Sequence, residues 1–207
     1  GENIEIWLKI IEIVNNCDFF SSPIGLGHVT RDIAIARNLQ GISINFITGS
    51  GAAKILKKLD FKIQDAYNPP SFIVNEGILK NQTKWLWSYF QYYKNCKNIS
   101  EKILKTNKTD LVISDEDFAS LTVAQNLEIP NILITDVLET RFTKGIASFV
   151  ERKMNKSMMN IIKNCDAVII PEIGEDYDNI KRVGPVVREI NISREELRKK
   201  FSFNKTT

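Results

Sequence analysis

Short apolar runs that alternate with longer helical stretches constrain the fold of this chain more than any other feature. Six runs are short, mostly β-branched and apolar, which is typical of strands covered on both faces. They are Cys17–Ser21, Ile42–Thr48, Phe61–Asp65, Leu111–Ser114, Asn131–Thr135 and Ala167–Ile170. The helical stretches between them cover about residues 30–40, 51–59, 80–106, 118–127 and 139–164. This alternation predicts right-handed β–α–β units, so we expect an α/β fold: one doubly wound, Rossmann-like parallel sheet with helices on both faces.

Composition narrows the class of protein further. The chain has 207 residues, of which 43% are hydrophobic and 26% charged, as in an ordinary globular domain. A net charge of +3 is too small to predict nucleic-acid binding. The three cysteines are widely spaced and form no C-x-x-C pattern, which favours a reducing, cytoplasmic compartment. No apolar run approaches the ~18–20 residues of a transmembrane helix, and no signal peptide is expected.

The only histidine of the chain, His28, lies in a glycine-containing segment between the first strand and the first helix. This segment, Ser22–Arg31, contains Gly25 and Gly27 and ends in a cation. A glycine turn that leads into a helix is a site for an anionic group, because backbone N–H groups converge there. The helix dipole adds only roughly 0.3–1 kcal/mol, so a strong anion site also needs a cation such as Arg31. A lone histidine is often structural, but here His28 can also move a proton near neutral pH.

Polar residues follow most of the other predicted strands. Because ligands bind at the carboxyl ends of the strands in a doubly wound sheet, these residues are expected to share one edge. They are Thr48–Gly51, Asp115–Asp117, Asp136 with Glu139, and Glu172. Asp117 by itself is a plausible helix N-cap, whereas the group as a whole indicates a polar cleft. No spacing typical of metal ligands is present.

Five segments resemble GT-B glycosyltransferases, in particular the peptidoglycan lipid-linked N-acetylglucosaminyltransferase and its archaeal relatives. The segments occur in the family's order, and the resemblance covers about residues 17–200. They are Phe20–Arg31, Ile47–Gly51, Leu111–Asp115, Ala124–Ile134 and Val183–Arg188. The first and last of them are the most specific, and the others are common in α/β proteins.

The resemblance implies that this chain is the N-terminal, acceptor-binding half of an inverting glycosyltransferase. The acceptor would be lipid-linked or phosphorylated, and the donor a nucleotide sugar, most simply a UDP-sugar, held by a separate C-terminal half. His28 is the first candidate for the base that deprotonates the acceptor hydroxyl, with Asp115 or Glu116 as the second. The predicted phosphate cradle is Gly25, Leu26, Gly27 and Arg31, and the predicted cleft lining is Thr48, Gly49, Ser50, Thr135 and Asp136. Neither a metal nor a tightly bound cofactor is expected.

The same resemblance divides the chain into three parts. Residues 1–16 form an apolar extension, residues 17–188 form the acceptor domain, and residues 189–207 form a linker or the start of a donor domain. The alternative is a noncatalytic acceptor-binding or scaffold subunit that recruits a separate donor-binding chain. A dinucleotide-binding domain fits less well, because Thr30 stands where a G-x-G-x-x-G motif needs its third glycine.

Three features bear on peripheral contact with the inner face of a membrane. Residues 3–14 would form a nearly all-apolar helix, which is either buried or interfacial. Trp87 lies off the apolar stripe that starts at Trp85, on a side of the helix that is otherwise polar, where it is either covered by residues 68–78 or in contact with a lipid-linked acceptor. Residues 152–163 are basic and partly apolar, which suits a solvated helix face or a membrane surface.

Overall fold

A computed structural model of the chain describes residues 14–71, 74–75, 78–79, 82–139, 147–187 and 193–200. These residues form one parallel sheet of seven strands in the order β3-β2-β1-β6-β7-β8-β9, and a separate hairpin, β4-β5. The sheet strands are β1 (Asn16–Ser21), β2 (Ser43–Thr48), β3 (Ile63–Asp65), β6 (Leu111–Asp115), β7 (Asn131–Ile134), β8 (Ala167–Ile170) and β9 (Ile180–Arg182). The hairpin strands are β4 (Val74–Asn75) and β5 (Ile78–Leu79). The predicted doubly wound α/β sheet is therefore confirmed.

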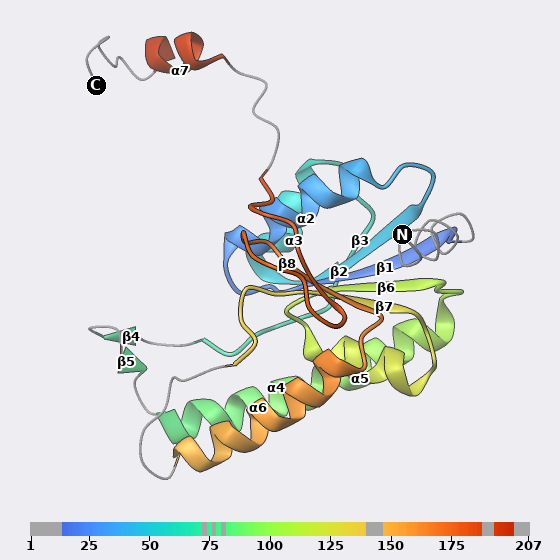
Figure 1. Cartoon of the computed structure of the whole chain (residues 1–207), viewed down its shortest axis with the longest axis vertical. Coiled ribbons are helices and arrows are strands. Elements are labelled where there is room, and N and C mark those ends of the chain that lie inside the picture. The colour runs from blue at the N-terminus through green and yellow to red at the C-terminus, as the bar shows by residue number, and fades with distance from the viewer. Residues whose placement is uncertain are drawn as a thin grey trace.

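Helices cover both faces of the sheet (Figure 1). They are α2 (Leu26–Asn38), α3 (Ser50–Lys58), α4 (Gln82–Thr106), α5 (Phe118–Asn126), α6 (Ala147–Lys163) and α7 (Arg194–Lys200). Figure 1 shows α2 and α3 on one face and α4, α5 and α6 on the other, while α7 lies apart from both layers. Among the helices that are described, none is long and apolar enough to cross a bilayer.

Adjacent residues of the central strands supply the cores of the two layers. Phe19 and Phe46 stack at 4.9 Å between ring centroids and pack with Leu56 under α2 and α3. Their neighbours Phe20 and Ile47 enter the core on the opposite face, beneath α4 and α5. Side chains alternate between the two faces of a strand, so continuous apolar runs are what a sheet covered on both sides requires.

The sequence predictions differ from the structure at several boundaries. Strand β9 was not expected, because it has only three residues and two of them are basic. The first helix begins at Leu26 and not near residue 30, because Gly25 ends the loop with φ 88° and Gly27 is tolerated in the first helical turn. The sequence predicted the last long helix over about residues 139–164, and within the described residues this helix covers Ala147–Lys163. The predicted helix over 3–14 falls almost entirely outside the described residues.

The order of the strands reverses between β1 and β6, and this reversal positions the site. The two strands pair in parallel with Ser21 opposite Asp115, so their carboxyl ends lie together. The chain leaves β1 toward α2 on one face and leaves β6 toward α5 on the other (Figure 1). A crevice at the carboxyl ends of such strands is the usual ligand position in open α/β sheets.

Gly49, between β2 and α3, is fixed by a close approach of two backbone segments. A Cβ atom at this position would lie 1.7 Å from the carbonyl oxygen of Tyr67. We therefore expect Gly49→Ala to lower the free energy of unfolding by about 1–3 kcal/mol, the usual cost of forced overpacking. The measurement is urea denaturation of the purified chain.

Gly51→Ala is the matched control for this prediction. A Cβ atom there would meet only the Leu26 side chain, at 3.5 Å, and the residue is helical. Alanine in place of a helical glycine should be neutral or stabilise by roughly 0.5–1 kcal/mol. Equal losses for the two variants would contradict this account of Gly49.

Candidate functional site

The start of α2 presents unpaired backbone donors at the crevice. Gly25 is its N-cap residue, no side chain caps the helix, and its first turn contains no acidic residue. The N–H groups of Leu26, Gly27 and His28 therefore have no partner within the helix. The start of α3 has the same character, because Gly49 caps it without a side-chain bond and no acid follows. Leu26 lies close to Gly51, so the two helix starts are neighbours.

His28 is held against the carboxylate of Asp115. Asp115 is the last residue of β6 and is fully buried. The Nδ1 atom of His28 lies 2.9 Å from Asp115 Oδ1, and its Nε2 atom lies 3.6 Å from Glu116 Oε2. With the proton on Nδ1, His28 donates to Asp115 and leaves Nε2 as the basic nitrogen. His28, Asp115 and Glu116 thus lie together at one edge of the sheet, and the direct pairing of His28 with Asp115 was not predicted from the sequence.

Arg31 makes ion pairs with two carboxylates. Its Nε atom donates to Asp115 Oδ2 at 2.8 Å and its NH2 group to Asp115 Oδ1 at 2.7 Å, a two-pronged arrangement. Its NH1 group donates to Asp136 Oδ1 at 2.6 Å. Arg31 is only 8% exposed, so its side chain faces these acids in place of solvent. This contact set favours a positioning role, while phosphate binding by Arg31 stays a prediction.

These contacts move the pKa values of both members of the His28–Asp115 pair. Burial raises the pKa of Asp115, but hydrogen bonds from His28, Arg31 and Asp32 outweigh it and hold the pKa at about 2. The hydrogen bond to Asp115 raises the pKa of His28, burial lowers it, and the negative charges of Asp115 and Glu116 complete a net rise. Asp115 is therefore ionised at neutral pH, and His28 binds a proton more readily than a free histidine.

Glu116 connects the ends of β6 and β7. Its backbone has φ 56°, an uncommon conformation for a residue with a side chain. Its Oε1 atom accepts from Thr135 Oγ1 at 3.3 Å and from the Asp136 backbone N–H at 3.2 Å. Strained backbone of this kind persists where surrounding contacts over-determine it, as at binding sites. Thr135, Asp136 and Glu116 thus form one polar rim next to His28.

The remaining predicted residues lie one strand away. Thr48, at the end of β2, is fully buried, and its hydroxyl oxygen has no hydrogen-bond partner. Ser50 is exposed at the first position of α3 with φ 55°. No hydrogen bond or ion pair among the described residues joins Thr48, Gly49 or Ser50 to the His28–Asp115 pair. They border the same sheet edge through the adjoining starts of α2 and α3.

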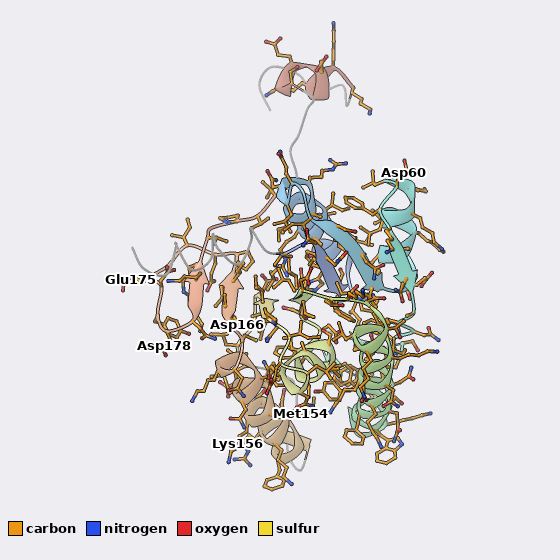
Figure 2. All side chains as sticks on the ribbon, turned by 90° about the vertical axis from the view of Figure 1, so that its right-hand side faces the viewer. Asp60, Met154, Lys156, Asp166, Glu175 and Asp178 are labelled. Carbon is orange, nitrogen blue, oxygen red and sulfur yellow. The ribbon has the colours of Figure 1, made fainter. Side chains whose placement is uncertain are left out.

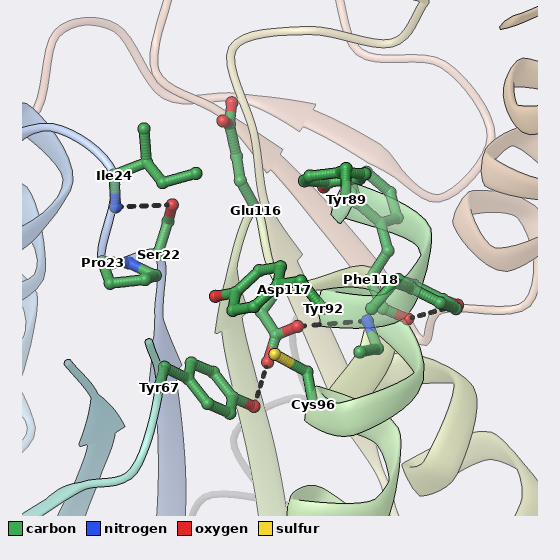
Figure 3. Close-up of a pocket in the computed structure, with 12 residues that line it drawn as sticks. Ser22, Pro23, Ile24, Tyr67, Tyr89, Tyr92, Cys96, Glu116, Asp117 and Phe118 are labelled. Carbon is green, nitrogen blue, oxygen red and sulfur yellow. Dashed lines mark hydrogen bonds between the residues drawn. The ribbon is translucent and has the colours of Figure 1, made fainter. Parts of the chain in front are cut away.

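A small aromatic cavity of about 30 Å³ has Glu116 in its wall. Tyrosines from α4 form much of its wall, and Figure 3 shows Glu116 between Ile24 on one side and Tyr89 on the other. Tyr67 donates to Asp117 at 2.6 Å, and Asp117 accepts from the Ala119 N–H at 3.1 Å as the N-cap of α5. The capping interpretation of Asp117 is confirmed.

Sequence reasoning missed Asp32, which is fully buried one helical turn after His28. The signal available was its spacing: residues four apart lie on the same helix face, so Asp32 follows His28 toward β6. Within the described part of the chain, no group of three or more His, Cys, Asp or Glu side chains is arranged to hold a metal ion.

Comparisons with known proteins give structural matches only. No family model matches the chain, and no curated protein does. The glycotransferase of kitacinnamycin is 12% identical with a TM-score of 0.63, over 86% of this chain and 53% of that one. MurG of Acinetobacter baumannii is 13% identical with a TM-score of 0.54, over 85% and 47%. A UDP-glucosyltransferase from Polygonum tinctorium is 10% identical with a TM-score of 0.59, over 92% and 57%.

At sequence identities this low, the structural similarity establishes the fold alone. The chain has the Rossmann-like fold of one half of a GT-B glycosyltransferase, and the resemblance expected from the sequence is confirmed at that level. It spans about half the length of the structures that it matches.

The raised pKa of His28 gives a direct test of the pair. Asp115→Asn removes the hydrogen-bonded charge, so the NMR titration midpoint of His28 should fall by roughly 1 pH unit. His28 is the only histidine, so its ring signals need no assignment. Glu116→Gln is the control, because Glu116 lies farther from the ring and should lower the midpoint less. A midpoint unaffected by Asp115→Asn would contradict the pairing.

Proposed function

We propose that this chain is the acceptor-binding half of an inverting glycosyltransferase, with His28 as the catalytic base. The observation that carries the proposal is the buried Asp115 carboxylate hydrogen-bonded to His28 Nδ1, at the sheet edge where the strand order reverses. This arrangement leaves Nε2 as the acceptor for a proton. The proposed substrates are a lipid-linked or phosphorylated acceptor and a nucleotide sugar, such as a UDP-sugar.

The geometry supports a simple sequence of proton and bond changes. Nε2 of His28 takes the proton of the acceptor hydroxyl as its oxygen attacks the anomeric carbon of the sugar. The bond from that carbon to the nucleotide diphosphate breaks, and the diphosphate leaves with the electron pair. Asp115 stabilises the imidazolium that forms, and Arg31 keeps Asp115 in place. Glu116, 3.6 Å from Nε2, is close enough to orient the hydroxyl or to act as the second candidate base.

A pH dependence follows from the pKa of His28. The base must be unprotonated, and hydrogen bonding to Asp115 raises the pKa of His28 above its ordinary value. Transfer by the assembled enzyme should therefore increase as pH rises through the His28 midpoint, and Asp115→Asn should move that rise to lower pH.

The neighbouring starts of α2 and α3 are proposed to hold an acceptor phosphate. Both present free N–H groups and neither has an acid in its first turn. Gly25, Leu26 and Gly27 lie at the first of these starts, and Gly49 and Ser50 at the second. The donor would be held by a second α/β domain or a separate chain. This division suits a chain that spans about half of its structural matches.

Leu26 allows the phosphate role to be tested by charge alone. It is 58% exposed, so substitution should leave the fold intact. In isothermal titration with a short-chain polyprenyl phosphate, Leu26→Asp should weaken binding about tenfold or more, since it brings a like charge to the helix start. Leu26→Asn, the neutral match, should bind within a few-fold of the unaltered chain.

Two outcomes of this titration would count against the proposal. If Leu26→Asp and Leu26→Asn weaken binding equally, the acceptor phosphate does not bind at the start of α2. Tight binding of UDP-N-acetylglucosamine to the chain alone would make it the donor half.

The enzyme is further proposed to work on the cytoplasmic side of a membrane, in contact with anionic lipid. Trp87 and Phe90 on α4 are 65% and 52% exposed, and Phe149 on α6 is 62% exposed. The first halves of α4 and α6 lie at the same end of the molecule (Figures 1 and 2). Exposed aromatic rings with nearby cations are typical of interfacial binding.

The charges around these rings have one sign. Lys94 lies over the Phe90 ring at 5.9 Å and Arg152 over the Phe149 ring at 6.0 Å. Lys153 and Lys156 are also exposed on α6, and Figure 2 shows Lys156 at the edge of that helix. Two acids belong to these helices: Glu151 of α6 is buried, and Glu101 lies in the second half of α4, where it pairs with Lys105.

Vesicle flotation tests this surface. The triple variant Trp87→Ser, Phe90→Ser, Phe149→Ser should lose most binding to phosphatidylglycerol-containing vesicles, because the interfacial apolar area is removed. Ile173→Ser is the control: Ile173 is 88% exposed and belongs to the segment between β8 and β9, not to α4 or α6. Unchanged binding by the triple variant, or equal binding to vesicles of phosphatidylcholine alone, would contradict the proposal.

A further inference from the structure

A second buried carboxyl group lies behind the His28–Asp115 pair. Asp32 belongs to α2 and is 0% exposed. Its Oδ2 atom accepts a hydrogen bond from the hydroxyl of Ser21, the residue paired with Asp115 across the sheet. Its Oδ1 atom is buried and accepts no hydrogen bond. An ionised carboxylate with one bare, buried oxygen would be strongly destabilised.

Among the described residues, no cation makes an ion pair with Asp32, and the positive charge of Arg31 does not offset the effect of burial on the pKa of Asp32. The guanidinium of Arg31 makes its ion pairs with Asp115 and Asp136. His28 in turn makes its own pairs with Asp115 and Glu116. Ser21 links the two acids, because its hydroxyl donates to Asp32 Oδ2 and its backbone lies opposite Asp115 in the sheet. Two carboxyl groups can hydrogen-bond to each other only if one of them holds a proton.

We propose that Asp32 is a positioning residue that holds a proton and donates it in a hydrogen bond to Asp115. Ser21 and Asp32 then fix the Asp115 carboxylate from one side while Arg31 and His28 fix it from the other. Asp115 stays ionised and aimed at His28, and Asp32 stays neutral. The protonation of Asp32 is independent of the reaction, whereas its effect on catalysis rests on the proposed function of His28.

The electrostatic surroundings agree with this division. Burial raises the pKa of Asp32 well above its ordinary value, and the neighbouring Asp115 charge raises it further. The hydrogen bond from Asp32 contributes to the lowered pKa of Asp115. When their environments drive the pKa values of two carboxyl groups apart, one group stays protonated and the other ionised, so the two take different roles. Here the neutral member orients the charged one.

The variant Asp32→Asn tests whether Asp32 is neutral or charged in the folded chain. Asparagine has the same shape and no charge, its oxygen can accept from Ser21, and its NH₂ group can donate to Asp115. We expect the NMR titration midpoint of His28 to be unchanged in this variant. A fall of roughly 1 pH unit, the effect of removing a nearby negative charge, would show that Asp32 is ionised and would overturn the proposal.

Asp32→Leu tests the hydrogen bond itself. Without the donor, Asp115 retains more of its negative charge for His28, so the His28 midpoint should rise and its Nδ1 proton should exchange faster. If Asp32 only fills space, the His28 midpoint and the exchange of its Nδ1 proton in Asp32→Leu should match those of the unaltered chain. That result would also overturn the proposal.

The pH dependence of unfolding provides a readout that does not depend on His28. A carboxyl group whose pKa is raised in the folded state binds more protons there than in the unfolded chain, so stability falls as pH rises above its unfolded value. The unaltered chain should lose stability relative to Asp32→Asn between mildly acidic and neutral pH. Parallel stability curves would contradict a neutral Asp32 even if Asp32→Leu fails to fold.

In an assembly that transfers sugar, Asp32→Asn should retain kcat and Asp32→Leu should reduce kcat more than it raises KM. The absence of any transfer would count against the proposed function alone, because the titration and unfolding experiments require no activity.

Discussion

The buried carboxylate of Asp115 receives hydrogen bonds from two residues of α2, and the geometry of the site depends on it. His28 and Arg31 lie about one turn apart on the helix, so both reach the end of β6 from one side. A buried charge is tolerated only when it is paired and hydrogen-bonded. Here that requirement couples the first helix to the sheet and fixes the orientation of the only histidine. The same interaction therefore contributes to packing and prepares a basic nitrogen.

The sheet supplies the positions on which this pairing rests. Because β1 and β6 are neighbours although about 90 residues separate them, Ser21 and Asp115 end side by side. The loop after β1 leads to α2 and the chain after β6 leads to Glu116, whose strained backbone turns its side chain toward His28. Apolar residues on both faces of the two strands are buried in the two cores of the domain. The chemistry proposed for this edge would thus use a framework that the hydrophobic core has already fixed.

Two other features of the surface suit two different kinds of ligand. The starts of α2 and α3 present unpaired N–H groups beside the crevice, which suits an anionic ligand. The exposed rings of α4 and α6 lie among cations at one end of the molecule, which suits a lipid surface. A lipid-linked phosphate would connect the two features.

The sequence by itself determined the α/β class, six of the seven strands of the parallel sheet, the glycine turn and the candidate residues at the strand ends, because hydrophobic periodicity and turn chemistry are local. It did not determine β9, whose three residues are held by pairing with β8 and not by their own pattern. Nor did it determine that Arg31 pairs with Asp115 and Asp136, or that Asp32 lies buried beside them. Those facts depend on which strands become neighbours and on how much water they exclude. Burial and pairing across long stretches of chain are decided by the tertiary structure, and they move the pKa values of Asp32 and Asp115 in opposite directions.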